Sequence, residues 1–209
     1  MKTNLKHFLA VMAVVSLGTV AVRATSLVPG TAISPLSPEA EPAVGSVLVV
    51  SLSAPVTALS FTGTLVSSVY SSDSSNPWGG LTFTYQLYNN GPDTVERLTL
   101  SSFAGFLTDV SYNGSGIVPL NAVRTAAGNQ ISFNFRTPDE QGTLTPGASS
   151  SLLIIQTDSS RYQNSIAGVI NSSTANSATF APAAVPEPAT VTLAVFGVVA
   201  CLLGRQLKP

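Results

Sequence analysis

Residues 81–88 have the sequence Leu-Thr-Phe-Thr-Tyr-Gln-Leu-Tyr, in which large apolar side chains fall at every second position until the terminal tyrosine. Successive side chains of a β-strand point to opposite faces, so this spacing predicts a strand with one face in a core. Residues 61–69 and 131–136 alternate in a similar way. Between the two ends of the chain no segment shows a helical period, so we expect an all-β protein.

The turn residues and the remaining apolar runs extend this prediction. Residues 89–93, Asn-Asn-Gly-Pro-Asp, predict a hairpin that returns residues 94–101 as the partner of 81–88. Residues 47–53 are predicted to form an edge strand, and 106–112 a further strand. Residues 151–157 contain a run that is apolar on both faces, which predicts a central strand.

About seven to nine short strands with regularly spaced turns favour an antiparallel β-sandwich, which we place at residues 47–180. Residues 81–100 and 144–157 resemble the immunoglobulin-like repeats of bacterial surface proteins. This resemblance implies an immunoglobulin-like sandwich. Residues 25–46 contain four prolines among small residues, so they are predicted to be a Pro-rich linker.

The N-terminus has the pattern of a signal peptide that would form a helix. Lys2 and Lys6 precede 15 apolar or small residues at 8–22, and Val22, Arg23 and Ala24 supply small or tolerated residues at the positions that signal peptidase inspects. We expect signal peptidase to cleave after Ala24, which makes 1–24 the signal peptide. The alternative is a buried core helix, which a position directly behind two lysines does not favour.

The C-terminus has a second apolar segment. Residues 191–203 would form a helix of about 20 Å, which is short for a hydrocarbon core of about 30 Å, and the predicted membrane helix extends over about 190–204. Arg205 and Lys208 follow it and are expected to stay on the cytoplasmic side. The segment would therefore halt export and hold the chain in the inner membrane transiently.

Directly before this helix stand Val185, Pro186, Glu187 and Pro188. Two prolines keep the segment extended, as a protease or transpeptidase cleft requires. The motif, the apolar helix and the basic end, at residues 181–209, resemble the PEP-CTERM sorting signal of exported bacterial proteins. The resemblance implies recognition by an exosortase-like membrane enzyme, association with exopolysaccharide or biofilm, and a final place at the cell surface or outside the cell. A plain membrane anchor and a GPI signal are alternatives, and the basic end fits the GPI signal poorly.

Removal of both ends would leave a body without His, Cys or Lys. Residues 25–187 contain ten acidic residues and four arginines, so the body carries about six negative charges. Ser-His-Asp catalysis and histidine zinc sites are excluded for such a body, and we expect neither catalytic residues nor a metal or cofactor. Net negative charge, with arginines too few and too scattered for a polyanion groove, gives no case for nucleic-acid binding.

Aromatic residues are the candidate binding residues. Trp78, in a Gly-rich loop, could stack on a sugar together with Tyr70 and Tyr88, or it could cap one end of the core. Asp73 in the same loop could bind calcium, although no spaced acidic ligands accompany it, and Asp139 with Glu140 is expected in a solvated loop. The leading hypothesis is a noncatalytic exported surface or matrix protein. A carbohydrate-binding module is the alternative, and a carboxylate-dependent glycosidase is a third possibility.

Overall fold

The structure is a computed structural model that describes residues 25–136 and 143–185. In these ranges the chain forms strands and turns without an α-helix, which confirms the all-β prediction. The predicted signal segment 1–24, the acidic pair at Asp139 and Glu140, and the predicted membrane helix lie outside the described residues. No helix within the described ranges has the length and apolarity to cross a bilayer.

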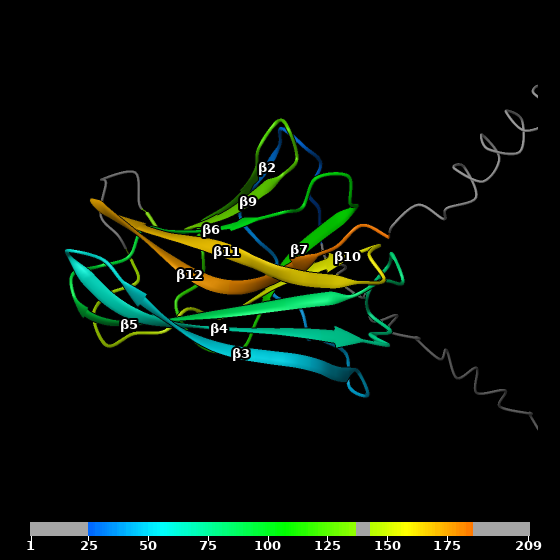
Figure 1. Cartoon of the computed structure of the whole chain (residues 1–209), viewed down its shortest axis with the longest axis horizontal. Helices are drawn as coiled ribbons and strands as arrows, with labels where there is room; N and C mark the ends of the chain where they lie inside the picture. The colour runs from blue at the N-terminus through cyan, green and yellow to red at the C-terminus, as the bar shows by residue number, and fades with distance from the viewer. Residues whose placement is uncertain (1–24, 137–142, 186–209) are drawn as a thin grey trace, which may run out of the picture.

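Two six-stranded antiparallel sheets make up the described part of the chain (Figure 1). The first has the order β1-β7-β10-β5-β4-β3. Its strands are β1 (Thr25–Ser26), β3 (Val47–Thr57), β4 (Phe61–Ser71), β5 (Thr82–Pro92), β7 (Thr108–Asn113) and β10 (Leu152–Thr157). β3 is an edge strand and β10 lies inside the sheet, as the sequence predicted for both.

The second sheet has the order β12-β11-β6-β9-β8-β2. Its strands are β2 (Ala32–Ile33), β6 (Arg97–Ser101), β8 (Asn121–Arg124), β9 (Gln130–Asn134), β11 (Tyr162–Asn171) and β12 (Ser173–Pro182). The long hairpin of β11 and β12 is a feature that the sequence analysis did not single out.

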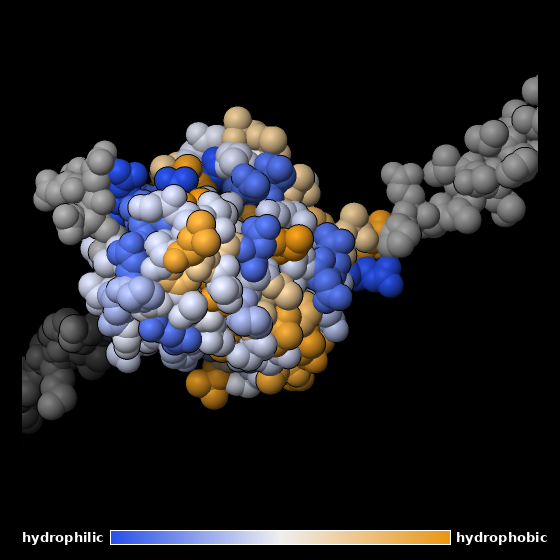
Figure 2. Space-filling model, turned by 60° about the vertical axis from the view of Figure 1, so that its left-hand side comes forward, coloured by the Kyte–Doolittle hydropathy of each residue, from blue (hydrophilic) through white to orange (hydrophobic). Residues whose placement is uncertain are grey.

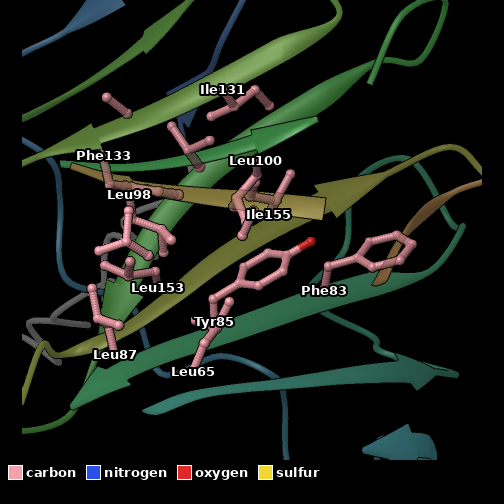
Figure 3. Packing of buried hydrophobic residues seen from close by; sticks show 14 of the residues in the cluster. Leu65, Phe83, Tyr85, Leu87, Leu98, Leu100, Ile131, Phe133, Leu153 and Ile155 are labelled. Carbon is pink, nitrogen blue, oxygen red and sulfur yellow. The ribbon is translucent and has the colours of Figure 1, made fainter. Parts of the chain in front are cut away.

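The inner faces of the two sheets share one hydrophobic core. Figure 3 shows side chains of both sheets pointing toward one another. Among them are Leu65, Phe83, Tyr85, Leu87, Leu153 and Ile155 from the first sheet and Leu98, Leu100, Ile131 and Phe133 from the second. The hydroxyl of Tyr85 is also satisfied, because it donates to the Phe180 carbonyl at 2.9 Å. The alternating apolar positions of the sequence therefore build this core.

The predicted hairpin between residues 81–88 and 94–101 is wrong. β5 pairs with β4 on one side and with β10 on the other, so neither edge is free for β6. The chain instead crosses to the second sheet, where β6 pairs with β9 and β11. Asn89 supports the crossing, since its Nδ2 donates to the carbonyls of Asp93 and Leu144 and its Oδ1 accepts from Gly91 N.

Residues 25–46, predicted as a linker, are instead packed against both sheets. β1 extends the edge of the first sheet beside β7, and β2 extends the second beside β8. Leu27 and Leu36 are buried in the core, at 0% and 4% exposure. We refer to residues 25–46 as the arm. Its four prolines lie outside β1 and β2, so they remove no hydrogen bond from the ladders of these two strands.

One face of the molecule is mostly polar. Figure 2 shows one face, largely hydrophilic or intermediate, with hydrophobic residues gathered toward its lower side. Three exposed apolar residues, Val47, Leu48 and Val49, begin the edge strand β3. A register shift between Leu48 and Val50 interrupts the ladder there, and Pro55 follows further along, two features that discourage pairing with another strand.

Candidate functional site

The three aromatic residues proposed for sugar stacking do not form one platform. Tyr70 pairs with Thr82 at the loop end of β4 and β5, whereas Tyr88 pairs with Thr64 at the other end. Thr82 and Tyr88 are six residues apart on β5, or about 20 Å at 3.4 Å per residue. Tyr88 therefore lies far from the loop that carries Trp78, and its hydroxyl donates to Gln86 Oε1 at 2.7 Å.

Trp78 is half-buried, and its indole Nε1 is fully enclosed. It interacts with the Asp109 carboxyl, although Nε1 makes no hydrogen bond of normal geometry. Burial raises the pKa of Asp109, and the contacts with Trp78 and Ser26 oppose that rise. The indole thus covers a buried acid on the outer face of the first sheet, which supports a covering role more than an open stacking role.

Asp73 anchors the loop between β4 and β5. Its carboxylate accepts hydrogen bonds from the Ala43 and Ser75 amides and from the Ser75, Thr82 and Gln156 side chains. Burial alone would raise the pKa of Asp73, but these bonds outweigh burial and lower it. Protein donors therefore occupy the oxygens that a calcium ion would need. Within residues 25–136 and 143–185, no three His, Cys, Asp or Glu residues are arranged to hold a metal ion.

The arm places two more acids against the outer face of the first sheet. Glu41 is 3% exposed and accepts from the Ser111 hydroxyl at 2.7 Å. Burial, together with the charge of Glu41, raises the pKa of Glu39 to about 7. A glycosidase needs two carboxyl groups beside an open sugar-binding groove. Glu41 and Asp109 are instead buried groups, at 3% and 4% exposure, and they fit a structural role.

The outer face of the second sheet, in contrast, is hollowed. A depression of about 480 Å³ lies over β6, β8, β9, β11 and β12. Its polar lining consists of Arg97, Thr99, Ser101, Thr125, Gln130, Ser132, Asn134 and Asn176, and its apolar lining of Val123, Ile166 and Ile170, with Gly168 between the isoleucines. A second hollow of about 650 Å³ shares Arg97 and Asn134 with it and adds Arg136. We refer to the two together as the sheet groove.

Cross-strand pairs give the groove a regular polar floor. Arg97, Thr99 and Ser101 of β6 stand opposite Asn134, Ser132 and Gln130 of β9. Arg97 Nε donates to Asn134 Oδ1 at 2.7 Å, and the Thr99 and Ser132 hydroxyls are 2.9 Å apart. The floor thus presents hydroxyl and amide groups, which both donate and accept hydrogen bonds, and a guanidinium, which only donates them.

The arginines are less scattered than the sequence suggested. Arg97 and Arg136 line the same hollow, although 39 residues separate them in the chain. Arg136 also pairs with Glu96, with 3.8 Å between Nη1 and Oε2. Arg124 has a different role, since it is 2% exposed and its donors bind protein acceptors.

Sequence reasoning missed the groove, although one signal for it was present. Along their strands, apolar core residues alternate with polar residues that face outward. Three of these outward residues are Thr99, Ser132 and Asn134. Their strands meet only because β6 changes sheets, which the turn at 89–93 did not predict. The fold and site thus define an all-β domain with an open polar groove on one sheet.

No family model, curated protein or solved structure matches the chain.

Proposed function

We propose that this chain is an exported bacterial surface or extracellular-matrix protein without a catalytic role. In this proposal an immunoglobulin-like β-sandwich stands between a signal helix, removed by signal peptidase after Ala24, and a short membrane helix at about 190–204. An exosortase-like membrane enzyme sorts the protein through Val185, Pro186, Glu187 and Pro188. The protein then leaves the inner membrane for the cell surface or an exopolysaccharide matrix.

The order of features at the C-terminus is the observation that carries this proposal. A Pro-Glu-Pro motif, an apolar run and a basic end follow one another within residues 185–208. The structure supports access to the motif, because Val185 directly precedes Pro186 and is 61% exposed. Among the described residues, the last strand, β12, ends at Pro182, and the Ala183 amide donates to Arg161 O at 3.0 Å, three residues before Pro186.

The mass of the mature protein tests the proposal. Protein recovered from the surface or medium of a bacterium with the sorting enzyme should begin near Thr25 and end near the motif. Glu187→Gln should leave the tail uncleaved and the protein in the membrane fraction. Glu140→Gln is the matched control and should be processed as the native chain is. A mature protein that still ends at Pro209 would indicate a plain anchor, and an intact chain in the cytosol would contradict export.

A second candidate function is carbohydrate binding, and the sheet groove is the observation that favours it. Sugar hydroxyls both donate and accept hydrogen bonds, as the hydroxyl and amide side chains of the groove floor do. Ile166, Ile170 and Val123 offer apolar contact for the C–H faces of sugar rings. The proposed contact residues therefore move from Trp78, Tyr70 and Tyr88 to the second sheet.

A filling substitution tests this second candidate. A Cβ at Gly168 would meet no atom within 4 Å, so Gly168→Val should fold normally while filling the groove. We expect loss of retention on immobilised polysaccharide, with an unchanged melting temperature. Ser53→Val, at an exposed position of β3 in the other sheet, is the matched control. Equal retention of both variants would place carbohydrate binding elsewhere.

A further inference from the structure

The groove floor is an extended row of side chains along two paired strands. Its polar residues alternate along β6 from Arg97 to Ser101, and each has a polar partner on β9. The four steps from Arg97 to Ser101, at about 3.4 Å each, give the row a length of about 14 Å. On one side β11 contributes Ile166, Gly168 and Ile170, and on the other β8 contributes Val123. Such a row suits an elongated ligand with many hydroxyl groups.

Charge distinguishes the groove from the rest of the molecule. Arg97 is exposed, and its Nε bond to Asn134 Oδ1 holds one edge of the guanidinium in place. A guanidinium has five N–H donors, and two of them can bind one carboxylate in parallel. No acidic residue is among the described residues that line either hollow, whereas residues 25–187 as a whole are acidic.

We propose that the sheet groove binds a carboxylate-bearing polysaccharide, such as a chain of uronic acids. A carboxylate of the chain would bind Arg97, and its hydroxyls would bind the row of hydroxyl and amide side chains. This inference rests on the proposed carbohydrate-binding function and adds the class of ligand. Single-stranded nucleic acid fits less well, because it requires aromatic stacking and the described lining residues include no aromatic ring.

The test compares two probes that differ only in the carboxylate. The full chain, purified in detergent, is titrated with an oligogalacturonate and with the same oligosaccharide after reduction of its carboxyl groups to alcohols. We expect the acidic probe to bind at least about tenfold more tightly, since charge-assisted hydrogen bonds are stronger than neutral ones. Arg97→Gln should abolish this preference, so that both probes bind alike. Arg161→Gln, at an exposed arginine outside the groove, should retain it.

The outcomes separate the inference from the function on which it rests. Equal binding of both probes to the native chain, with no effect of Arg97→Gln, would overturn the acidic-ligand inference and leave carbohydrate binding in place. Failure of both probes to bind would overturn the two together. Tighter binding of a single-stranded oligonucleotide than of either probe would also overturn the inference. Gly168→Val should weaken both probes if the groove is the site.

Discussion

Arg124 shows how one side chain can join several segments of this fold. It is 2% exposed, and its donors reach the carbonyls of Leu27, Phe103, Phe106 and Gly128 and the hydroxyl of Thr108. None of these five hydrogen bonds goes to a carboxylate. Burial lowers the pKa of the guanidinium, and the charge of Asp158 opposes this. The planar guanidinium therefore acts as a structural connector between the arm, β7, β8 and the loop before β7.

Replacing this connector should destabilise the protein strongly. Arg124→Lys keeps the charge but offers three donors on one nitrogen, so buried carbonyls would lose their partners. We expect the free energy of unfolding to fall by about 3 kcal/mol, measured by urea denaturation. Arg161→Lys, at an exposed arginine, should change it by less than about 0.5 kcal/mol. Equal stabilities of the two variants would show that the hydrogen bonds of Arg124 contribute little.

The sequence could not distinguish the roles of individual residues that share a type. Arg97 lies in the predicted strand 94–101 and Arg124 lies between predicted strands, and neither position told that the first is exposed in the groove and the second is buried. The core alternation at residues 81–87 was predictable because it depends on local spacing. The surroundings of Trp78 depend on Asp109, 31 residues away, and on strand pairing that no local pattern encodes.

The arm is the segment whose observed role differs most from the role that its sequence predicts. Its two strands contain two residues each, which is too short for any period to appear. Its backbone pairs instead with β7 and β8, and Glu39 N donates to Tyr112 O at 2.8 Å. The connection between β5 and β6 also differs from what its turn residues predict, again because distant strand pairing decides it. Turn residues predict a local hairpin, but β10, which comes some 60 residues later, occupies the position beside β5.

A pair of adjacent substitutions tests whether the arm belongs to the folded domain. Leu27 is fully buried and Val28 is 54% exposed. Leu27→Ala should lower the free energy of unfolding by about 2–5 kcal/mol, through lost burial and the cavity left behind. Val28→Ala should have an effect of less than about 0.5 kcal/mol. Urea denaturation measures both, and a neutral Leu27→Ala would return the arm to the status of a linker.

At the scale of the whole molecule, the two sheets differ in what covers their outer faces. The first sheet is covered by the arm and the loop that carries Trp78, with Glu41, Asp73 and Asp109 buried between them. The outer face of the second sheet is hollowed and lined with hydroxyl, amide and guanidinium groups. Part of the negative charge of the chain is therefore buried against the first sheet, while the groups proposed to bind a ligand lie on the second.

The buried acids predict an unusual dependence of stability on pH. Burial and the nearby Glu41 charge raise the pKa of Glu39 from 4.5 to about 7, and burial also raises the pKa values of Glu41 and Asp109. A raised pKa means that the folded state binds more protons than the unfolded state between the two pKa values. The free energy of unfolding should therefore fall as the pH rises from about 4.5 to about 7. Asp73 has the opposite shift, so its contribution is lost only as the pH falls through its lowered pKa.

Thermal unfolding between pH 4 and pH 8 measures this dependence. We expect the highest melting temperature near pH 4–5 and a loss of about 1–2 kcal/mol by pH 8, because partial exposure of Glu39 reduces the full effect of its shift. Glu39→Gln should remove much of the slope and raise the stability at pH 8. Asp93→Asn, at an exposed acid, should leave the slope as it is. A native protein whose melting temperature rises steadily from pH 5 to pH 8 would show that the arm does not desolvate these carboxyl groups in solution.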